Sequence, residues 1–301
     1  MENNEIVIIG GGQLGGALQK FFPQARLLDY PEVDITDYES LVAAFAEIEN
    51  VEVIINTAAW TDVNAAELEE NYSKVLKINC DGVVNLKRIA SLYNAVFVQI
   101  STDYVFDGRR AFHDEEEESS PLNVYGSTKK MADNVVANYE KHYIVRISWL
   151  VGDYAENTRP NFVKTVVNLL TEQPEVTMID DQFGRLTFTS DLVEAINFLL
   201  ETQSEYGIYN VSGDGEVLSW YELAQEIRGA MLNSGKFKDS ELGIIVPISS
   251  DEFEARVKHV IAQRPRNSAL NLAKIQSVGF NPDDHLADLS KYVSLLLEQK
   301  G

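Results

Sequence analysis

The chain has 301 residues, of which 45% are hydrophobic and 24% charged, and its formal net charge is −22. A length of this order suits about two lobes, and the apolar content is ample for a buried core. The strongly negative charge disfavours nucleic acid and anionic membrane surfaces as partners.

The first predicted elements are a strand at Ile6–Ile9, a glycine turn and an amphipathic helical stretch from Ala17 to Phe22. The turn reads Gly10-x-Gly12-x-x-Gly15, in which Gly10 allows the tight turn, Gly12 lets backbone approach a pyrophosphate and Gly15 lets the helix pack closely. Such a pattern is also common as an ordinary turn. The flanking strand and a later acidic residue favour a dinucleotide site here.

That acidic residue ends a second short predicted strand, Ala25–Asp29. Asp29 follows Gly10 at about the spacing of 20 residues expected for a ligand of the ribose 2′-hydroxyl. The sequence therefore slightly favours NADH over NADPH. Tyr30 comes next and offers no partner for a 2′-phosphate, although Arg26 could serve as one.

Further strands and helices alternate along the chain, which is typical of a parallel sheet. The predicted strands are Val51–Ile55, Val96–Ile100 and Tyr143–Ile147, and the predicted helices run around Glu67 to Tyr93, from about Tyr125 to Lys141 and from Asn161 to Leu170. Right-handed crossovers would bring the carboxyl ends of the strands to one ligand-binding edge. We predict an α/β fold with a Rossmann-type doubly wound parallel sheet and a smaller C-terminal substrate-binding lobe. Residues 1–150 and part of 187–220 would form the dinucleotide-binding domain, and residues 151–186 and 221–301 the lobe.

Two segments carry candidate catalytic groups: Ser101-Thr102-Asp103-Tyr104-Val105-Phe106 and Tyr125-Gly126-Ser127-Thr128-Lys129. The i to i+4 spacing puts Tyr125 and Lys129 on one helix face. The ammonium would stabilise the phenolate and lower the tyrosine pKa from its usual ~10. Chance could produce such a pair among 13 tyrosines, but only Tyr125 has a lysine four positions on. The pair predicts a proton-donating tyrosine of a carbonyl reductase.

We expect a cytoplasmic protein without a membrane span, because no apolar run reaches eighteen residues and no basic region precedes an apolar run at the start. Cys80 is the single cysteine and cannot form an internal disulfide. The four histidines are scattered without metal-ligand spacing, so no metal is predicted.

These motifs together resemble the extended short-chain dehydrogenase/reductase superfamily and, within it, the dTDP-4-dehydrorhamnose reductase family. The resemblance spans nearly the whole chain. Its pieces are Asn56 to Val63 with Ala66-Glu67, Ser101 to Phe106, Pro121 to Lys129, Arg146 to Trp149, Asn161-Phe162, Asp181 to Gly184, Asp191-Leu192 and Arg264 to Ser268.

The resemblance implies that a nicotinamide cofactor, NADH or NADPH, reduces the C4 ketone of a nucleotide-activated 6-deoxy-4-keto sugar, as in dTDP-rhamnose biosynthesis. Tyr125 would protonate the carbonyl oxygen, Lys129 would hold the nicotinamide ribose, and Thr102 would hydrogen-bond the same oxygen. Ser101 is the rival for the hydroxyl role. Related dehydratases carry an Asp-Glu pair where this chain has Asp103-Tyr104, which argues against dehydration.

On the same basis we expect a cofactor site and a substrate site. The cofactor residues would be Gly10, Gly12, Gln13, Leu14, Gly15, Asp29, Asp34, Ile35, Ala58, Ala59, Ser101, Tyr125 and Lys129. The substrate residues would be Thr61, Val63, Thr102, Asp103, Tyr104, Phe106, Trp149, Asn161 and Arg264. Tyr104, Phe106 and Trp149 would be apolar walls, or purely structural aromatic residues. Arg264 would bind the diphosphate, unless this basic cluster only balances nearby acids.

Three features depart from the family pattern. The glycines of the first turn are more closely spaced than usual. Ala17 replaces a glutamate through which some members bind a metal between subunits, so a homodimer stays an open expectation. Arg185 follows Asp181 to Gly184 where the family commonly has a small or apolar residue, and it would contact an anionic substrate or mark a different loop.

Two other functions stay open. The fold also serves as a nicotinamide-binding regulatory subunit without turnover, resembling the accessory subunit of methionine adenosyltransferase. The chain could instead reduce a different nucleotide-linked keto sugar, because pocket shape, built from scattered residues, reads the stereochemistry of a hydroxyl.

Overall fold

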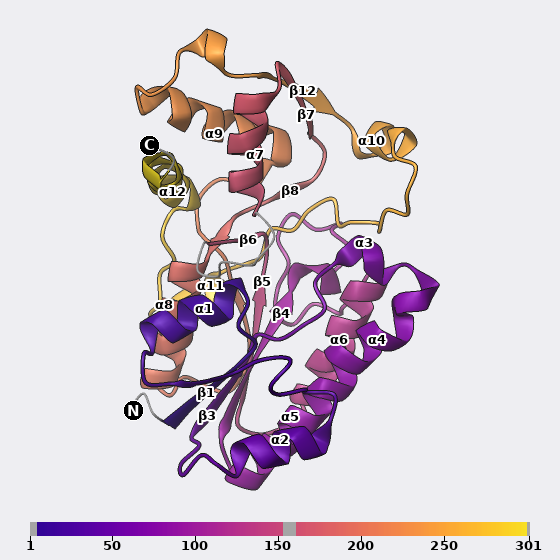
Figure 1. Ribbon diagram of the computed structural model, residues 1–301, viewed down its shortest axis with the longest axis vertical. Helices are drawn as coiled ribbons and strands as arrows, with labels where there is room; N and C mark the ends of the chain where they lie inside the picture. The colour runs from indigo at the N-terminus through magenta and orange to yellow at the C-terminus, as the bar shows by residue number, and fades with distance from the viewer. Residues whose placement is uncertain (1–4, 153–160, 300–301) are drawn as a thin grey trace.

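A six-stranded parallel sheet forms the centre of the molecule, in the strand order β10-β5-β4-β3-β1-β2. The computed structural model describes residues 5–152 and 161–299. The strands of the sheet are β1 (Ile6–Ile9), β2 (Arg26–Leu28), β3 (Val53–Asn56), β4 (Val96–Thr102), β5 (His142–Ile147) and β10 (Gly207–Val211). This parallel order confirms the predicted Rossmann-type α/β fold, and the view in Figure 1 shows the sheet between two layers of helices.

Helices cover both faces of the sheet, which explains why β1 and β3 are nearly continuous runs of Val and Ile. One face is covered by α1 (Gln13–Phe21), α8 (Thr189–Glu201) and α11 (Ala273–Ser277). The other face is covered by α2 (Tyr38–Phe45), α5 (Gly82–Tyr93) and α6 (Val124–Val136). Ile6 and Ile8 point to the first layer while Val7 and Ile9 point to the second, as the alternation of side chains along a strand requires.

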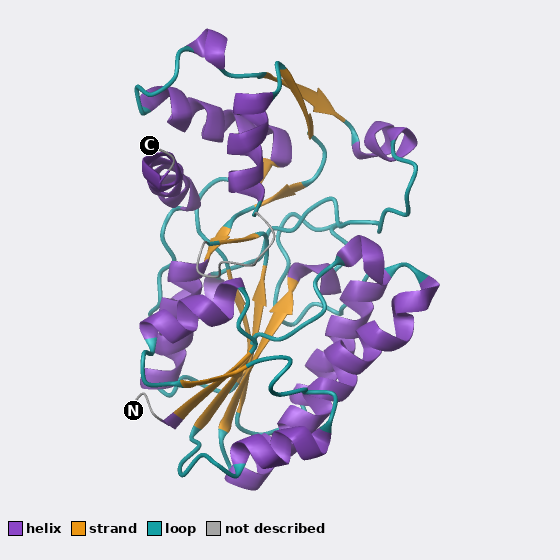
Figure 2. Ribbon diagram, viewed as in Figure 1, coloured by secondary structure: helices purple, strands orange, loops and turns teal. Residues whose placement is uncertain are grey.

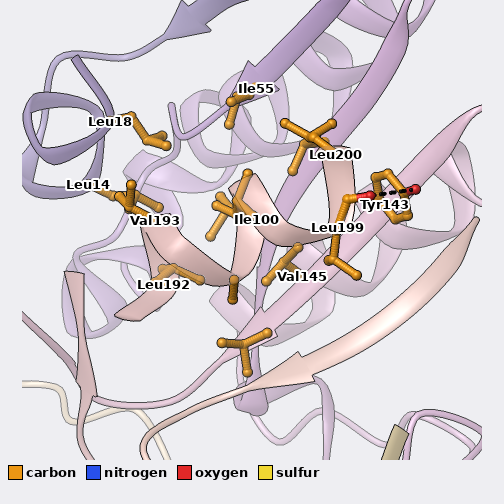
Figure 3. Close-up of a cluster of buried hydrophobic side chains, with 14 of the residues drawn as sticks. Leu14, Leu18, Ile55, Ile100, Tyr143, Val145, Leu192, Val193, Leu199 and Leu200 are labelled. Carbon is orange, nitrogen blue, oxygen red and sulfur yellow. Dashed lines mark hydrogen bonds between the residues drawn. The ribbon is translucent and has the colours of Figure 1, made fainter. Parts of the chain in front are cut away.

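The core beneath α1 and α8 is drawn in Figure 3. Leu14 and Leu18 of α1 and Leu192 and Val193 of α8 lie in one cluster with strand residues such as Ile100. The Tyr143 hydroxyl on β5 donates to the Leu199 carbonyl oxygen at 3.2 Å, so the one polar atom of that buried side chain is satisfied. Because α8 comes from the second half of the chain, this core joins distant parts of the sequence.

A second hydrophobic core lies above the carboxyl edge of the sheet, among α7 (Phe162–Glu172), α9 (Trp220–Asn233) and α12 (His285–Gln299). Two parallel strands, β7 (Glu175–Ile179) and β12 (Ile244–Ile248), pair beside it. The short elements are β6 (Leu150–Val151), β8 (Phe183–Gly184), β9 (Thr187–Phe188), β11 (Leu218–Ser219), η5 (Asp239–Glu241) and α10 (Ser250–Arg256). Within the two described ranges, we find no helix with the length and apolar character needed to cross a bilayer.

The segment predicted as one helix around Glu67 to Tyr93 is divided in the structure. It forms α3 (Val63–Ala66), η2 (Glu69–Asn71), α4 (Tyr72–Leu76), a π-helical turn η3 (Lys77–Asp81) and α5. The Asn79 side chain in the π turn accepts from the Trp60 amide at 2.7 Å and donates to the Thr128 hydroxyl at 3.0 Å. The helix is therefore interrupted where it ties the loop after β3 to α6. Helix α6 also ends at Val136, short of the predicted Lys141.

Candidate active site

The glycine turn between β1 and α1 has the shape that its sequence predicts. Gly10 has φ +94°, and a Cβ on Gly15 would overlap the carbonyl oxygen of Gly10. A Cβ on Gly12 would meet no described atom within 4 Å, and no side chain of the described residues caps the first turn of α1. The backbone at Gly12 is therefore accessible, and the free amides of the first turn of α1 can donate hydrogen bonds to a pyrophosphate. Leu14 is buried in the core, so this residue offers the cofactor only its backbone.

The neighbouring residues extend this edge. Asp29 is exposed just after β2, and its carboxylate lies 2.6 Å from the position a Gly11 Cβ would take, so it is beside the glycine turn and could accept from a ribose hydroxyl. The Thr57 hydroxyl donates at 2.9 Å to the carbonyl oxygens of Ile9 and Gly10, and it fixes the turn against β3. Sequence reasoning places Thr57 at the ligand-binding edge but does not reveal this contact, because its partners are backbone atoms distant in the sequence.

The remaining predicted cofactor residues lie around this edge with different exposure. Ala58 and Ala59 are half-buried, and the Ala58 amide would lie 2.8 Å from a Gly10 Cβ. Asp34 is half-buried and accepts from the Thr36 amide at 2.8 Å. Ile35 is buried against Gly82, so it supports α5 rather than presenting its side chain to a ligand.

Thr102 and Tyr125 meet at the carboxyl end of β4. The Thr102 hydroxyl donates to Asp103 Oδ1 at 3.0 Å, accepts from the Tyr104 amide at 3.2 Å, and hydrogen-bonds the Tyr125 phenol. Tyr104 lies in η4 (Asp103–Val105), and its ring is 5.8 Å from that of Tyr125 in an edge-to-face arrangement. A Cβ on Gly126 would overlap the Tyr104 carbonyl oxygen, so a glycine is what lets α6 approach η4 so closely.

Lys129 lies one turn further along α6, and it faces inward. Its Nζ donates to the Ile100 carbonyl oxygen at 2.6 Å, and burial lowers the pKa of the ammonium to about 8, while Asp133 opposes that shift. Burial, followed by the negative charge of Asp103, raises the pKa of Tyr125 above its usual value. The predicted lowering of the Tyr125 pKa by Lys129 is therefore wrong for this structure, because the ammonium is directed at Ile100 and Asp133.

Ser101, the rival for the hydroxyl role, is 2% exposed and lies close to the Asp133 carboxylate, whose pKa it helps to lower. Ser101 and Thr102 point to opposite sides of β4, and only the Thr102 hydroxyl contacts the Tyr125 phenol. The geometry favours Thr102.

Two predicted substrate residues are interior side chains. Phe106 is 0% exposed and stacks on the His113 ring with centroids 4.6 Å apart, so it is a core residue and not a pocket wall. Asp103 is 3% exposed, and burial raises the pKa of its carboxyl to about 7 despite hydrogen bonds from Ser268 and Thr102. Asp103 is therefore a buried hydrogen-bond acceptor for the Thr102 hydroxyl and not a substrate ligand, a role that its place in the sequence did not reveal.

Arg264 lies beside the catalytic edge. It hydrogen-bonds the Tyr104 phenol and lies 3.2 Å from Asn64 Oδ1, next to Val63 at the start of α3. Thr61 is exposed just before that helix. Arg266, by contrast, pairs with Asp181 and Asp251, as expected for a basic group that balances acids. The two arginines are only two positions apart in the sequence, but the structure gives them different partners.

Aromatic side chains line the second lobe near the end of β5. Trp149 has φ 45° and stacks on Trp220 with ring centroids 3.5 Å apart, while the Phe162 ring also contacts Trp220, with centroids 4.3 Å apart. Sequence reasoning found Trp149 but missed Trp220, which lies 71 positions later in the chain.

The Asn161 and Arg185 side chains serve the fold. Asn161 caps α7 and donates to the Gly152 carbonyl and the Tyr292 hydroxyl at 2.8 Å each, so its polar atoms already have partners. Arg185 is buried, pairs with Asp214 at 3.5 Å and lies over the Phe112 ring. The geometry therefore supports the expectation that Arg185 marks a loop different from the family pattern, and not the expectation that it contacts an anionic substrate.

Comparisons with known proteins agree with this geometry. A family model described as the RmlD substrate binding domain matches residues 4–297. The chain is 32% identical to the dTDP-4-dehydrorhamnose reductase of Aggregatibacter actinomycetemcomitans over 91% of this chain and 92% of that relative. The solved dTDP-4-dehydrorhamnose reductase of Clostridium acetobutylicum superimposes with a TM-score of 0.84 at 32% identity, covering 97% of this chain and 99% of that one. That of Bacillus anthracis str. Ames, in complex with NADP, gives 0.83 at the same identity and coverage.

Proposed function

Since the chain belongs to the dTDP-4-dehydrorhamnose reductase family, we propose that it reduces the C4 ketone of a nucleotide-activated 6-deoxy-4-keto sugar with NADH or NADPH. The observation that carries this proposal is the meeting of Thr102 with Tyr125 on the same sheet edge as the glycine turn. A hydroxyl pair at that edge can bind a carbonyl oxygen beside a nicotinamide.

Each group at the site has a separate role in the proposed reaction. A nicotinamide cofactor held at the glycine turn would supply the hydride for the carbonyl carbon. The Tyr125 phenol gives its proton to the carbonyl oxygen, and the Thr102 hydroxyl donates a hydrogen bond to that oxygen. The raised pKa of Tyr125 keeps its proton in place at neutral pH, as a donor in the reducing direction requires. Before substrate binds, the single Thr102 proton is directed at Asp103 Oδ1, so the hydroxyl has to turn away from this carboxyl to donate to the substrate oxygen.

Dehydration of the sugar is not supported. A dehydratase needs a separate acid and base at this strand end, and the chain has Asp103 and Tyr104 there. Asp103 is buried behind Thr102, and Tyr104 hydrogen-bonds Arg264. Neither side chain is free to act as a base toward a sugar.

The direct test is to follow NADH and NADPH consumption by absorbance with a dTDP-4-keto-6-deoxy sugar generated in the same tube. Rapid oxidation of either cofactor is expected. Cofactor binding without oxidation would support the regulatory-subunit alternative if a panel of other nucleotide-linked keto sugars also gave none. Oxidation with a different sugar in that panel would support reduction of that nucleotide-linked keto sugar instead.

The cofactor preference rests on Asp29. Replacing Asp29 with alanine is expected to weaken NADH binding more than NADPH binding, because the carboxylate can accept from a ribose 2′-hydroxyl but repels a 2′-phosphate. Fluorescence titrations with both cofactors measure the two losses. Equal losses would remove the basis for preferring NADH.

Arg264 is proposed to bind the diphosphate of the substrate. Substituting it with methionine, which keeps most of the apolar stem, is expected to raise KM about tenfold or more with little change in kcat, because a charge-assisted hydrogen bond contributes about 1.5–3 kcal/mol. Arg266→Met is the matched control, since Arg266 is engaged by Asp181 and Asp251. An unchanged KM in the Arg264 variant would assign this residue to structure.

Further proposals concern the whole molecule. We assign residues 1–150 and part of 187–220 to the dinucleotide-binding domain and residues 151–186 and 221–301 to the substrate lobe. The two cores support this division except at α11, whose Ile275 packs in the core of the sheet. The charge of −22 supports a protein without nucleic-acid partners. A homodimer and a cytoplasmic location stay predictions.

A further inference from the structure

Helix α6 carries a buried carboxylate that takes no part in the proposed reaction. Asp133 lies four positions after Lys129, and each of the two residues is only 4% exposed. The i to i+4 spacing puts their side chains on one face of the helix, with Cβ atoms about 5–6 Å apart. A carboxylate is costly to bury unless it is paired, so this position requires positive charge around it.

Arg146 on β5 is the direct partner of Asp133. Its Nε donates to Asp133 Oδ2 at 3.2 Å, and its Nη1 donates to the Glu115 carbonyl oxygen, also at 3.2 Å. Burial raises the pKa of Asp133, while the charge of Arg146 opposes that rise. Because an arginine keeps its proton in proteins, Arg146 stabilises the negative charge of Asp133 at neutral pH and fixes it in place against the sheet.

The Lys129 amine depends on this charge to stay protonated. Its Nζ donates to the Ile100 carbonyl oxygen, and we find no second acceptor for it within residues 5–152 and 161–299. Burial lowers the pKa of Lys129 to about 8, and Asp133 is the largest of the charges that oppose this shift. An opposite charge at this range changes a pKa by about 1–3, so without Asp133 about half or more of the Lys129 amines would be neutral at pH 7.

The other titratable groups around Lys129 do not replace this charge. On the elements packed against this part of α6 they are Cys80 and Asp81 on η3, Asp103 and Tyr104 on η4, and Arg146 on β5. Burial raises the pKa of the Cys80 thiol to about 11, so the thiol is neutral where Lys129 titrates. Asp81 is exposed to solvent, and the charge of Asp103 acts on the Tyr125 phenol, which burial keeps protonated. Asp133 therefore supplies the principal negative charge that Lys129 faces at neutral pH.

We propose that Asp133 is a positioning residue for the cofactor: its buried charge keeps the Lys129 amine protonated, so that the ammonium can bind the nicotinamide ribose. This inference rests on the proposed function and on the ribose-binding role expected of Lys129. Asp133 acts only through Lys129 and contacts neither the cofactor nor the reacting groups. The competing explanation is a purely structural ion pair, in which Asp133 and Arg146 join α6 to β5 and the charge state of Lys129 is independent of both.

The first measurement needs no substitution at Asp133. The full chain is labelled with lysine carrying ¹³C at Cε and titrated with base in the NMR spectrometer, without cofactor or substrate. The resonance that is missing from Lys129→Met belongs to Lys129. Its midpoint is expected near pH 8. A midpoint at the usual value of about 10.4 would overturn the proposal, because such an amine stays protonated at neutral pH without help from a neighbouring charge.

The second measurement compares variants of Asp133. Asp133→Asn removes the charge but keeps an oxygen for the Arg146 Nε. Losing a negative charge destabilises the ammonium, so the Lys129 midpoint should fall by about one pH unit or more. Binding of NADH and NADPH, followed by fluorescence, should weaken with rising pH at the same lower midpoint. Asp133→Glu restores the charge and should return both midpoints toward those of the unaltered protein. Glu140→Gln, which removes an exposed carboxylate beyond the far end of α6, should change neither.

The outcomes separate the two explanations. An unchanged Lys129 midpoint in Asp133→Asn, even with a lower Tm, would overturn the proposal and leave a structural ion pair. A lower midpoint without a matching change in the pH dependence of cofactor binding would also overturn it, because the charge of Lys129 would then not serve the cofactor. Both measurements precede turnover. A protein that shows both changes but reduces no 4-keto sugar would therefore contradict the proposed function and support the role of Asp133.

Discussion

Replacing Tyr125 with phenylalanine is expected to lower kcat by about 100-fold or more while leaving the dissociation constant of the cofactor nearly unchanged. Only the phenolic hydroxyl is lost, and with it the proton that balances hydride transfer. The ring remains to pack edge-to-face against Tyr104. Steady-state kinetics with the 4-keto sugar and a fluorescence titration with NADPH measure the two quantities separately.

Tyr139→Phe is the matched control for this variant. It removes the same atom from a tyrosine beyond the far end of α6, where the hydroxyl donates to the Ala95 carbonyl oxygen at 2.6 Å. We expect a loss of about 1 kcal/mol in stability and an unchanged kcat. A Tyr125→Phe enzyme with more than about a tenth of the normal rate would contradict the general-acid role.

The fold could be predicted because its signals are local. Runs such as Ile6–Ile9 and Val53–Asn56 are buried on both faces, and a strand of this kind is apolar at every position. The glycine turn could also be predicted from the sequence, since the positive φ of Gly10 and the close approach of Gly15 to the Gly10 carbonyl oxygen allow only glycine at these positions.

The parts that escaped prediction depend on partners distant in the sequence. The π turn at Asn79 serves Trp60 and Thr128, and no local periodicity encodes those contacts. Phe106 belongs to the same sequence motif as Thr102, yet it is a core residue, because the His113 ring stacks on its ring and Arg146 lies over it. The pKa of Tyr125 rises because of burial and the negative charge of Asp103, while the Lys129 ammonium, which the helix spacing placed beside the phenol, donates to the Ile100 carbonyl oxygen.

Gly126→Ala is the variant in which packing alone should disable the site. Alanine is the better helix former by about 1 kcal/mol, so an exposed position in α6 would gain stability from it. At Gly126, however, the new methyl group would overlap the Tyr104 carbonyl oxygen, and α6 would have to move away from η4. That movement separates Tyr125, on α6, from Thr102, at the end of β4.

The expected result is a fall in kcat of up to about 100-fold, the cost of a misplacement of about 1 Å between reacting groups, with every catalytic side chain still present. Gly229→Ala in α9 is the control, because no described atom lies within 4 Å of the added methyl group and the helix should only gain stability. Steady-state kinetics and thermal unfolding of both variants decide the question. A Gly126→Ala enzyme with normal kcat would mean that α6 can shift without moving Tyr125 relative to Thr102, and that the distance between these two hydroxyls does not limit the reaction.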